Sequence, residues 1–459
     1  MVLILIDDLG WRDLSCYGSS FYETPRIDEL AANGLLYRNA YAAAPVCSPT
    51  RASIMSGKYP ARVGVTQWIG GHGVGILGDV PYFRELPENE YSLARAFSAN
   101  GYATWHVGKW HLGPERCWPD RHGFDVNIGG CEMGSPKSYF SPYNIPTLPD
   151  GPDGEYLTDR LTDEAITLVR SSTETPFFLN LWHYAVHTPI QGPSDLVGKY
   201  REKASRLGLD TDAIETGEEM PTWHRAGHHV ERRTIQSNPA YAAMIENLDT
   251  NVGRLVDALA ETGKLENTII VFTSDNGGLS TAEGSPTCNA PLAEGKGWMQ
   301  DGGVRVPLIV TWNGRVPAGS ATDSMMTSPD LYPTLLAAAG LEGIPKQHVD
   351  GVNVLSEWVG DGQDRGPIFW HYPHYSNQGG RPGAAVREGN FKLVRYFEDG
   401  REELYDLDRD TGETTNLAHE LSDVRFRLSA ILSDWMRDVR AAIPTANPWS
   451  RPHDADRGA

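Results

Sequence analysis

The sequence lacks a long hydrophobic run, a large set of cysteines and an excess of positive charge. No apolar stretch reaches the roughly 20 residues that a membrane-spanning helix needs, so no membrane span is expected. Five cysteines in 459 residues are too few for a disulfide scaffold. The net charge of −20 argues against binding to nucleic acid or anionic membranes. If the substrate is an anion, a few basic groups in one pocket must attract it.

The cysteines and the first residues leave two questions open. With Cys47 set aside for chemistry, Cys117 and Cys131 could close a short loop, or all the remaining cysteines could be reduced. The chain opens directly on an apolar strand at Val2, with no visible signal peptide. A signal peptide that was removed and one that never existed are both compatible with this start. The length predicts either one large α/β domain and a smaller one, or two to three units.

The stretch from Cys47 to Arg51 reads Cys-Ser-Pro-Thr-Arg and is the central candidate for a functional site in this chain. Pro49 suits the first turn of a helix, and Gly57 suits the position just past its end. Cys47 is therefore expected at a helix N-terminus, which favours an anion, with Arg51 one turn further on the same face. This setting is typical of a nucleophile, although a lone cysteine is more often a buried small hydrophobe.

Apolar runs predict strands at 2–6, 102–107, 177–182 and 268–273 of a parallel sheet. Each run is followed by polar groups, and the carboxyl ends of parallel strands share one edge, where ligands bind. The alternatives are a helix N-cap at Asp7-Asp8, a solvated side chain for Lys109 and a satisfied core residue for His111. His183 competes with His187, and strand alternation does not separate them. The groups in question are Asp7, Asp8, Lys109, His111, His187, Asp275 and Asn276.

These groups predict a metal site beside a cluster of cations. Three aspartates and one asparagine offer only oxygen ligands, which suit Ca²⁺ or Mg²⁺ and suit Zn²⁺ poorly. Lys109 and His111 alternate around Trp110 and would point to one side of an extended chain. Lys296 stands between two glycines. A metal ion and such cations together stabilise an anionic ester and its transition state. The cationic or potentially cationic groups are Arg51, Lys109, His111, His187 and Lys296.

The rest of the chain supplies the frame. A further strand is expected at 306–311, and a small antiparallel sheet is expected from 367–370 and 392–396, with a turn at 398–400. The segment 192–238, with His224, His228 and His229, is interpreted as an exposed insertion without metal-ligand spacing. Boundaries are predicted for domains at 1–362 and 363–459, and the tail after Pro444 is expected to be loosely ordered. Helices are expected at 28–34 (capped by Gly34), 91–100, 157–171, 241–262, 329–340 and 418–441.

The stretch 47–51 and the opening Asp7-Asp8-Leu9-Gly10-Trp11 resemble the type I, formylglycine-dependent sulfatases of the alkaline phosphatase superfamily. The resemblance covers essentially the whole chain. It implies an α/β fold with a large mixed, mostly parallel sheet sandwiched by helices, and a small C-terminal α+β domain with an antiparallel sheet. It also implies that a formylglycine-generating enzyme or an anaerobic maturase oxidises Cys47 to formylglycine, which removes the mismatch between a soft thiolate and a hard ion.

The resemblance implies a role for each site residue. Asp7, Asp8, Asp275, Asn276 and position 47 match the family's Ca²⁺ ligands. Arg51 matches the residue that steadies formylglycine, and Lys109 and Lys296 match the lysines that hold the sulfate oxygens. His111 is similar to the histidine that hydrogen-bonds the formylglycine diol, and His187 to the one that protonates the leaving alcohol, a task for a group that titrates near neutrality. Thr50 departs from the commoner Ser or Ala.

The substrate is predicted by weaker resemblance. The stretches 123–130, 134–136, 150–160 and 371–387 look like bacterial carbohydrate sulfatases, which implies a sulfated saccharide, with galactose or N-acetylgalactosamine sulfated at O4 as the first candidate. Substrate contacts are considered for two groups of residues, namely Lys137, Tyr139 and Tyr143 in a long loop, and His371, His374 and Arg381 near the site mouth. The family implies a periplasmic or extracellular location, and a cytoplasmic one is the alternative.

Two other functions compete. A phosphohydrolase of the same superfamily would cleave phosphate or phosphonate esters, but the paired ligand set of a two-zinc enzyme is not evident in the sequence. A non-catalytic binder of sulfated glycans would keep the fold, but every expected active-site position is filled.

Overall fold

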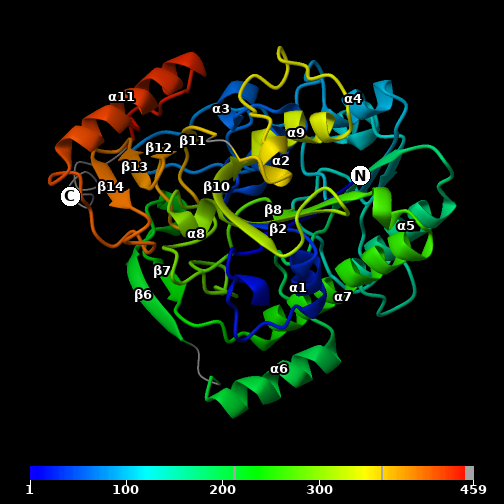
Figure 1. Ribbon diagram of the computed structural model, residues 1–459. Coiled ribbons are helices and arrows are strands. Elements are labelled where there is room, and N and C mark those ends of the chain that lie inside the picture. Colours follow the sequence, from blue (N-terminus) through cyan, green and yellow to red (C-terminus); the bar gives the residue numbers. More distant parts are fainter. Residues whose placement is uncertain (210–212, 363–364, 450–459) are drawn as a thin grey trace.

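The computed structural model describes residues 1–209, 213–362 and 365–449, and a large twisted sheet runs through its centre (Figure 1). Within the described residues this sheet has eight strands in the order β10-β2-β9-β8-β1-β5-β3-β4. Among these strands only β9 runs against the others, so the predicted mixed, mostly parallel sheet is confirmed. The strands are β1 (Val2–Ile6), β2 (Leu35–Tyr41), β3 (Ala103–Gly108), β4 (Val126–Ile128), β5 (Phe177–Trp182), β8 (Ile269–Ser274), β9 (Arg305–Trp312) and β10 (Ser320–Thr327).

Strand β1 is buried on both faces, as its continuous apolar sequence predicts. Val2, Ile4 and Ile6 point into one hydrophobic cluster, and Leu3 and Leu5 point into the other. Helices therefore have to cover both sides of the sheet. One side carries α1 (Pro25–Ala32), α5 (Leu157–Ser171) and α7 (Pro239–Glu261).

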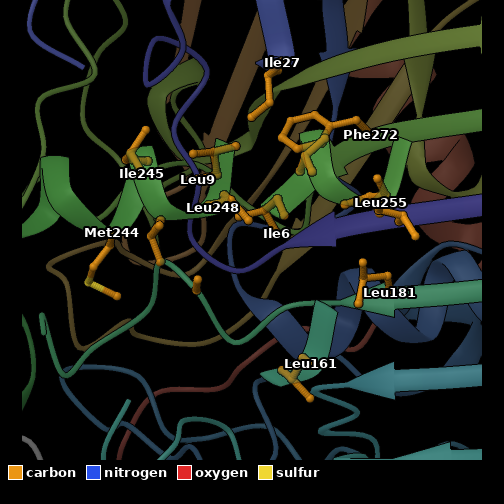
Figure 2. Close-up of a cluster of buried hydrophobic side chains, with 14 of the residues drawn as sticks. Ile6, Leu9, Ile27, Leu161, Leu181, Met244, Ile245, Leu248, Leu255 and Phe272 are labelled. Atoms are coloured by element: carbon orange, nitrogen blue, oxygen red, sulfur yellow. The ribbon is translucent and has the colours of Figure 1, made fainter. Parts of the chain in front are cut away.

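Helix α7 provides much of the packing on that side. Figure 2 shows its Leu248 beside Leu9 and Ile6, the residue at the end of β1, and Met244 and Ile245 of the same helix belong to the same hydrophobic cluster. The other side carries α2 (Cys47–Ser56), α4 (Leu93–Ala99) and α9 (Leu331–Ala338). Short elements complete the connections: α3 (Pro60–Val63), α8 (Asp301–Val304), α10 (Leu355–Trp358), and the 3₁₀ turns Ser15–Tyr17, Glu115–Cys117, Pro119–His122, Trp223–Arg225, Leu265–Asn267 and Ser328–Asp330.

The segment 192–238 contains regular structure that the sequence did not predict. It forms α6 (Ser194–Leu207) and a hairpin of β6 (Ile214–Glu219) and β7 (His229–Arg233). Tyr200 and Ala204 are the apolar residues that α6 buries, and α6 packs along α7, so tertiary contact compensates for a weakly apolar sequence. The histidine cluster at 224–229 is exposed, as expected.

The C-terminal part is the predicted small antiparallel sheet. Its strands are β11 (Ile368–Tyr372), β12 (Gly383–Glu388), β13 (Phe391–Tyr396) and β14 (Glu402–Asp406). One face packs against Tyr41, Val46 and Val304 of the large unit, and the other against α11 (Ser422–Asp438). The predicted domain boundary at 362/363 stays a prediction, because residues 363 and 364 are not among those that the structure describes. The predicted tail after Pro444 is described only as far as residue 449.

Two local predictions are wrong. Gly34 is not a left-handed helix cap, because the cap residue of α1 is Asn33 and Gly34 does not have a positive φ. A Cβ at Gly34 would lie 2.3 Å from the carbonyl oxygen of Val310 on β9, so the glycine permits close strand packing. Strand β3 ends at Gly108, and His111 has a φ of 56°, so the chain around Lys109 and His111 is not extended.

No helix in the described part combines the length and apolarity that crossing a membrane requires. The cysteines, Cys117 and Cys131 included, are all free thiols, so the short loop closed by a disulfide is absent.

Candidate active site

The two acidic pairs meet because β1 and β8 are parallel neighbours with Ile6 opposite Ser274. Asp7 and Asp8 follow the first strand, and Asp275 and Asn276 follow the second. The Asp8 backbone N–H donates to Asp275 Oδ1 at 3.2 Å, and Asn276 Nδ2 donates to Asp8 Oδ1 at 2.8 Å. All four side chains are buried. Like charges packed this closely need compensating cations.

Three buried cations face these carboxylates. Lys109 Nζ lies 2.6 Å from Asp7 Oδ2, and Lys296 Nζ lies 2.8 Å from Asp8 Oδ2. Arg51 binds Asp275 Oδ2 through Nε at 2.8 Å and through its NH2 nitrogen at 2.7 Å. Residues from α2, from the end of β3 and from the loop before α8 therefore converge on one edge of the sheet, as the sequence analysis predicts.

Cys47 is the first residue of α2 and is buried beside this cluster. Its sulfur and one ligand atom each of Asp7, Asp8 and His187 all lie within 4.8 Å of one another. Burial raises the pKa of the Cys47 thiol to about 12, against the opposing effect of Lys109 and Lys296. The helix N-terminus and the nearby cations thus do not activate the unmodified thiol, contrary to the interpretation of this setting from sequence.

The acidic cluster fits a hard divalent cation. Asp7 Oδ1 and Asn276 Oδ1 are buried oxygens without a hydrogen-bond partner, which native interiors rarely leave unsatisfied. Burial, with Asp275 and Asp8 adding to it and Lys109 and Arg51 opposing, raises the pKa of Asp7 to about 8. Burial also disfavours the charged form of Asp8, but Lys296, His187 and Lys109 together lower the pKa of that carboxyl. Oxygen-only ligands and unpaired lone pairs are what Ca²⁺ or Mg²⁺ requires.

The structure separates the two candidate histidines. His187 Nε2 lies 2.9 Å from Lys296 Nζ and 3.5 Å from Asp8 Oδ2, and Nδ1 lies 3.0 Å from the Thr188 carbonyl oxygen. Since Lys296 can only donate, Nε2 accepts and Nδ1 carries the hydrogen. His183 is fully buried, and neither ring nitrogen has a hydrogen-bond partner.

His187 does not titrate near neutrality. Burial and then Lys296 lower its pKa to about 3, so the imidazole is neutral at pH 7. The proton in the Lys296–His187 pair accordingly resides on the lysine. Burial, with Lys109 and Arg51, also lowers the pKa of His111, whose Nε2 lies 3.2 Å from the Ile69 carbonyl oxygen.

Two residues hold the site without touching the reaction centre. Tyr139 was considered as a substrate contact, but it is buried and donates to the carbonyl oxygens of Tyr184 at 2.6 Å and His187 at 2.9 Å, so it fixes the turn that carries His187. Ser48 Oγ donates to the His111 carbonyl oxygen at 2.9 Å and accepts from the Ile69 N–H at 3.0 Å. The sequence could not predict these hydrogen bonds, because the partners lie far apart along the chain: Tyr139 and Tyr184 are 45 positions apart, and Ser48 and His111 are 63 positions apart.

The other candidate substrate contacts fall into two groups, those buried and bonded within the protein and those accessible at the surface. His371 and His374 are buried and bonded within the protein, to the Ala442 carbonyl oxygen and to Thr66 and Asp79, respectively, so they are not free to meet a substrate. Tyr143 is likewise buried and bonded to Glu155. Lys137 is exposed, and Arg381 lies beside an open depression.

A family profile described as Sulfatase matches residues 1–341, which contain every residue of this site. The chain belongs to the sulfatase family. It is therefore a sulfuric ester hydrolase, and the predictions of family, fold and enzyme class are confirmed. A second profile, for the C-terminal part of N-sulphoglucosamine sulphohydrolase, matches residues 295–438 of this sulfatase.

Relatives cover most of the sulfatase chain. A sulfatase of Formosa agariphila is 30% identical over 97% of this chain and 89% of its own. The N-acetylgalactosamine-6-sulfatase of Sus scrofa is 32% identical over 81% and 68%. The crystal structure of Ps i-CgsB in complex with k-i-k-neocarrahexaose is similar with a TM-score of 0.77 and 26% identity, covering 99% of this chain and 96% of that one.

Proposed function

We propose that this sulfatase releases inorganic sulfate from a sulfated carbohydrate, with formylglycine made from Cys47 as the nucleophile. The observation that carries the proposal is the convergence of Cys47, three carboxylates and three cations in one buried cluster. A sulfated carbohydrate is favoured by the N-acetylgalactosamine-6-sulfatase relative and by the solved neighbour's complex with k-i-k-neocarrahexaose. We retain a galactose or N-acetylgalactosamine sulfate as the first candidate, with O4 and O6 as the positions to compare.

The residues divide the chemistry. Asp7, Asp8, Asp275 and Asn276 would hold Ca²⁺, or Mg²⁺ in its place, together with residue 47. Formylglycine in its hydrated form supplies a hydroxyl nucleophile and an oxygen ligand. Lys109 and Lys296, now paired with Asp7 and Asp8, carry ammonium groups that can turn to the sulfate oxygens of a substrate.

The remaining basic residues have roles in positioning and in proton transfer. Arg51 holds the Asp275 side chain in place through its Nε–H at 2.8 Å, and it also donates to the Lys109 carbonyl oxygen at 2.9 Å. Since Lys296 donates to His187 Nε2 at 2.9 Å, we assign this pair as the source of the proton for the leaving alcohol oxygen. His111 is neutral and would hydrogen-bond the hydrated formylglycine.

Maturation and location complete the proposal. A formylglycine-generating enzyme or an anaerobic maturase would oxidise Cys47 before the chain folds, because the folded thiol is buried. A periplasmic or extracellular location follows from the family resemblance and is proposed on that basis.

Mass spectrometry of the peptide that contains Cys47, from a host with a maturation enzyme, tests the nucleophile. We expect the mass of formylglycine and sulfate release from an aryl sulfate, and the Cys47→Ala variant should release none. An unmodified, active cysteine would refute the formylglycine mechanism. Faster turnover of the matching aryl phosphate would favour the phosphohydrolase alternative. Sulfate release from N-acetylgalactosamine 4-sulfate and 6-sulfate, measured side by side, decides the position.

A further inference from the structure

The hairpin β6–β7 is a two-stranded sheet of its own, and it is hydrogen-bonded to the core of the large unit. The Arg233 N–H, at the end of β7, donates to the Ser280 carbonyl oxygen at 3.0 Å. Ser280 Oγ in turn donates to the Glu294 carbonyl oxygen at 2.9 Å. The hairpin is therefore fixed against the loop that presents Lys296.

This loop, residues 294–298, has an unusual backbone conformation, and we call it the lysine loop. Glu294 has a φ of 60° and Gly297 a φ of 85°. The left-handed region is unfavourable for a glutamate and persists only where surrounding contacts impose it. One such contact comes from the segment before α2, because the Gly297 N–H donates to the Pro45 carbonyl oxygen at 2.8 Å. The position of Lys296 thus depends on what holds the lysine loop.

Arg232, on β7, contacts the lysine loop on both sides of Lys296. Its Nε and Nη2 nitrogens donate to the two carboxylate oxygens of Glu294, each at 2.8 Å. Its guanidinium also lies over the indole of Trp298, 5.5 Å from the ring centre. Glu294 precedes the lysine by two residues, and Trp298 follows it by two. One side chain therefore binds both ends of the turn that carries the lysine.

The hairpin also determines the direction of the Arg232 side chain. Its Nη1 and Nη2 nitrogens donate to the two carboxylate oxygens of Glu218 on β6, each at 2.9 Å. A Cβ at Gly217 would lie 2.0 Å from Arg232 Nη1, so this glycine leaves room for the guanidinium to cross the strand. A planar guanidinium that pairs through two nitrogens with a carboxylate on each side is fixed in orientation as well as in position.

The position of Lys296 matters because its ammonium group has two partners in the site. Nζ lies 2.8 Å from Asp8 Oδ2 and 2.9 Å from His187 Nε2. In the proposed function the same group also turns to the sulfate oxygens. Because a misplacement of about 1 Å can cost about 10²-fold in rate, contacts that fix the backbone of this lysine contribute to turnover.

Resting on the proposed function, we propose that Arg232 is a positioning residue for sulfate hydrolysis. It holds the lysine loop so that the Lys296 ammonium group meets the sulfate and His187. The hairpin β6–β7 then acts on the reaction through the lysine loop, and Arg232 itself does not touch the reacting atoms. Removal of its guanidinium should loosen the lysine loop and slow the reaction without unfolding the protein.

Steady-state kinetics with 4-nitrophenyl sulfate and amide hydrogen exchange, both on the mature full-length protein, test the proposal. Arg232→Ala should lower kcat/KM about tenfold, which corresponds to about 1.4 kcal/mol of transition-state stabilisation, and should speed hydrogen exchange in the lysine loop. Glu294→Met removes the carboxylate of the same ion pair at similar size and should have the same two effects. Because both substitutions break one interaction, the double variant should lose about tenfold in kcat/KM and not about a hundredfold.

Arg395→Ala is the matched control. Arg395 lies on β13 with 20% of its side chain exposed, pairs with Glu402 at 2.8 Å, and donates to Ser429 and Ser433 on α11. The Arg232 side chain is similarly sheltered, with 27% exposed. The control variant should leave kcat/KM and the exchange of the lysine loop unchanged.

Unchanged kcat/KM or unchanged exchange of the lysine loop in Arg232→Ala would overturn the inference alone. A loss in the double variant equal to the product of the single losses would do the same, as would an equal loss in Arg395→Ala. Should Arg232→Ala not fold, Glu294→Met carries the same comparison with the control. If the unaltered mature protein releases no sulfate from aryl or carbohydrate sulfates, the proposed function fails, and the exchange rates still decide whether Arg232 holds the lysine loop.

Discussion

The affinity of this sulfatase for Ca²⁺ should increase steeply between pH 6 and pH 8, and Asp7 should be the cause. The pKa of Asp7 is raised to about 8, mainly by burial, so in the ion-free protein this carboxyl holds a proton that it must release before it can bind an ion. Its pKa in the unfolded chain is 3.8. Because the folded state holds the extra proton, the stability of the ion-free protein falls as pH rises from about 4 to about 8.

The size of the effect follows from that pKa. The ionised fraction of a group with a pKa of 8 rises about fiftyfold from pH 6 to pH 8, which is worth about 2.3 kcal/mol of ion binding. Neither His187 nor Cys47 titrates in this interval, because the pKa of His187 is lowered to about 3 and that of Cys47 is raised to about 12. The dissociation constant for Ca²⁺ should therefore fall about fiftyfold across these two pH units.

Calorimetric or tryptophan-fluorescence titration of chelator-treated protein with CaCl₂ at pH 6, 7 and 8 measures the effect. Asp7→Asn mimics the protonated carboxyl and should bind Ca²⁺ weakly at every pH, with the pH dependence lost. Asp323→Asn, which alters a side chain that is 74% exposed, is the matched control and should behave like the unaltered protein. A dissociation constant that changes less than about threefold from pH 6 to pH 8 would refute the reasoning about Asp7.

Three further predictions concern other buried groups. Lys392→Met removes the cation that pairs with two buried carboxylates at 2.8 and 3.0 Å, and should destabilise the protein by about 3–5 kcal/mol in denaturant unfolding; a loss below 1 kcal/mol would contradict that pairing. Tyr139→Phe removes two hydrogen bonds to the turn that carries His187, and should lower kcat about tenfold while costing only about 1–3 kcal/mol of stability. His187→Ala should reduce kcat by about 10²-fold or more, whereas His183→Leu should retain near-normal turnover, because its ring makes no hydrogen bond; equal losses would show that the two roles are misassigned.

The sequence alone was enough to predict the edge of the sheet at which the chemistry occurs. Continuous apolar runs identified β1, β3, β5 and β8, and the polar residues after them had to meet because parallel strands end together. The Cys-Ser-Pro-Thr-Arg stretch predicted helix α2 and its first residue, since proline and glycine restrict where a helix starts and stops. These patterns involve only neighbouring residues, so they can be recognised in a single sequence.

Local patterns did not predict helix α6 or the hairpin β6–β7, because both depend on what they pack against rather than on a strong apolar period. They also left His183 and His187 equivalent, and only the approach of Lys296, more than 100 residues further along the chain, distinguished them.

The sequence by itself thus determined which side chains lie at the sheet edge that forms the active site, because neighbouring residues determine where each strand and helix begins and ends. Protonation states were decided by the tertiary structure alone: burial makes the Cys47 thiol inert and His187 neutral, and it makes Asp7 hold its proton. A charge in a protein interior is governed by everything within a few ångströms of it, and those neighbours come from distant parts of the chain.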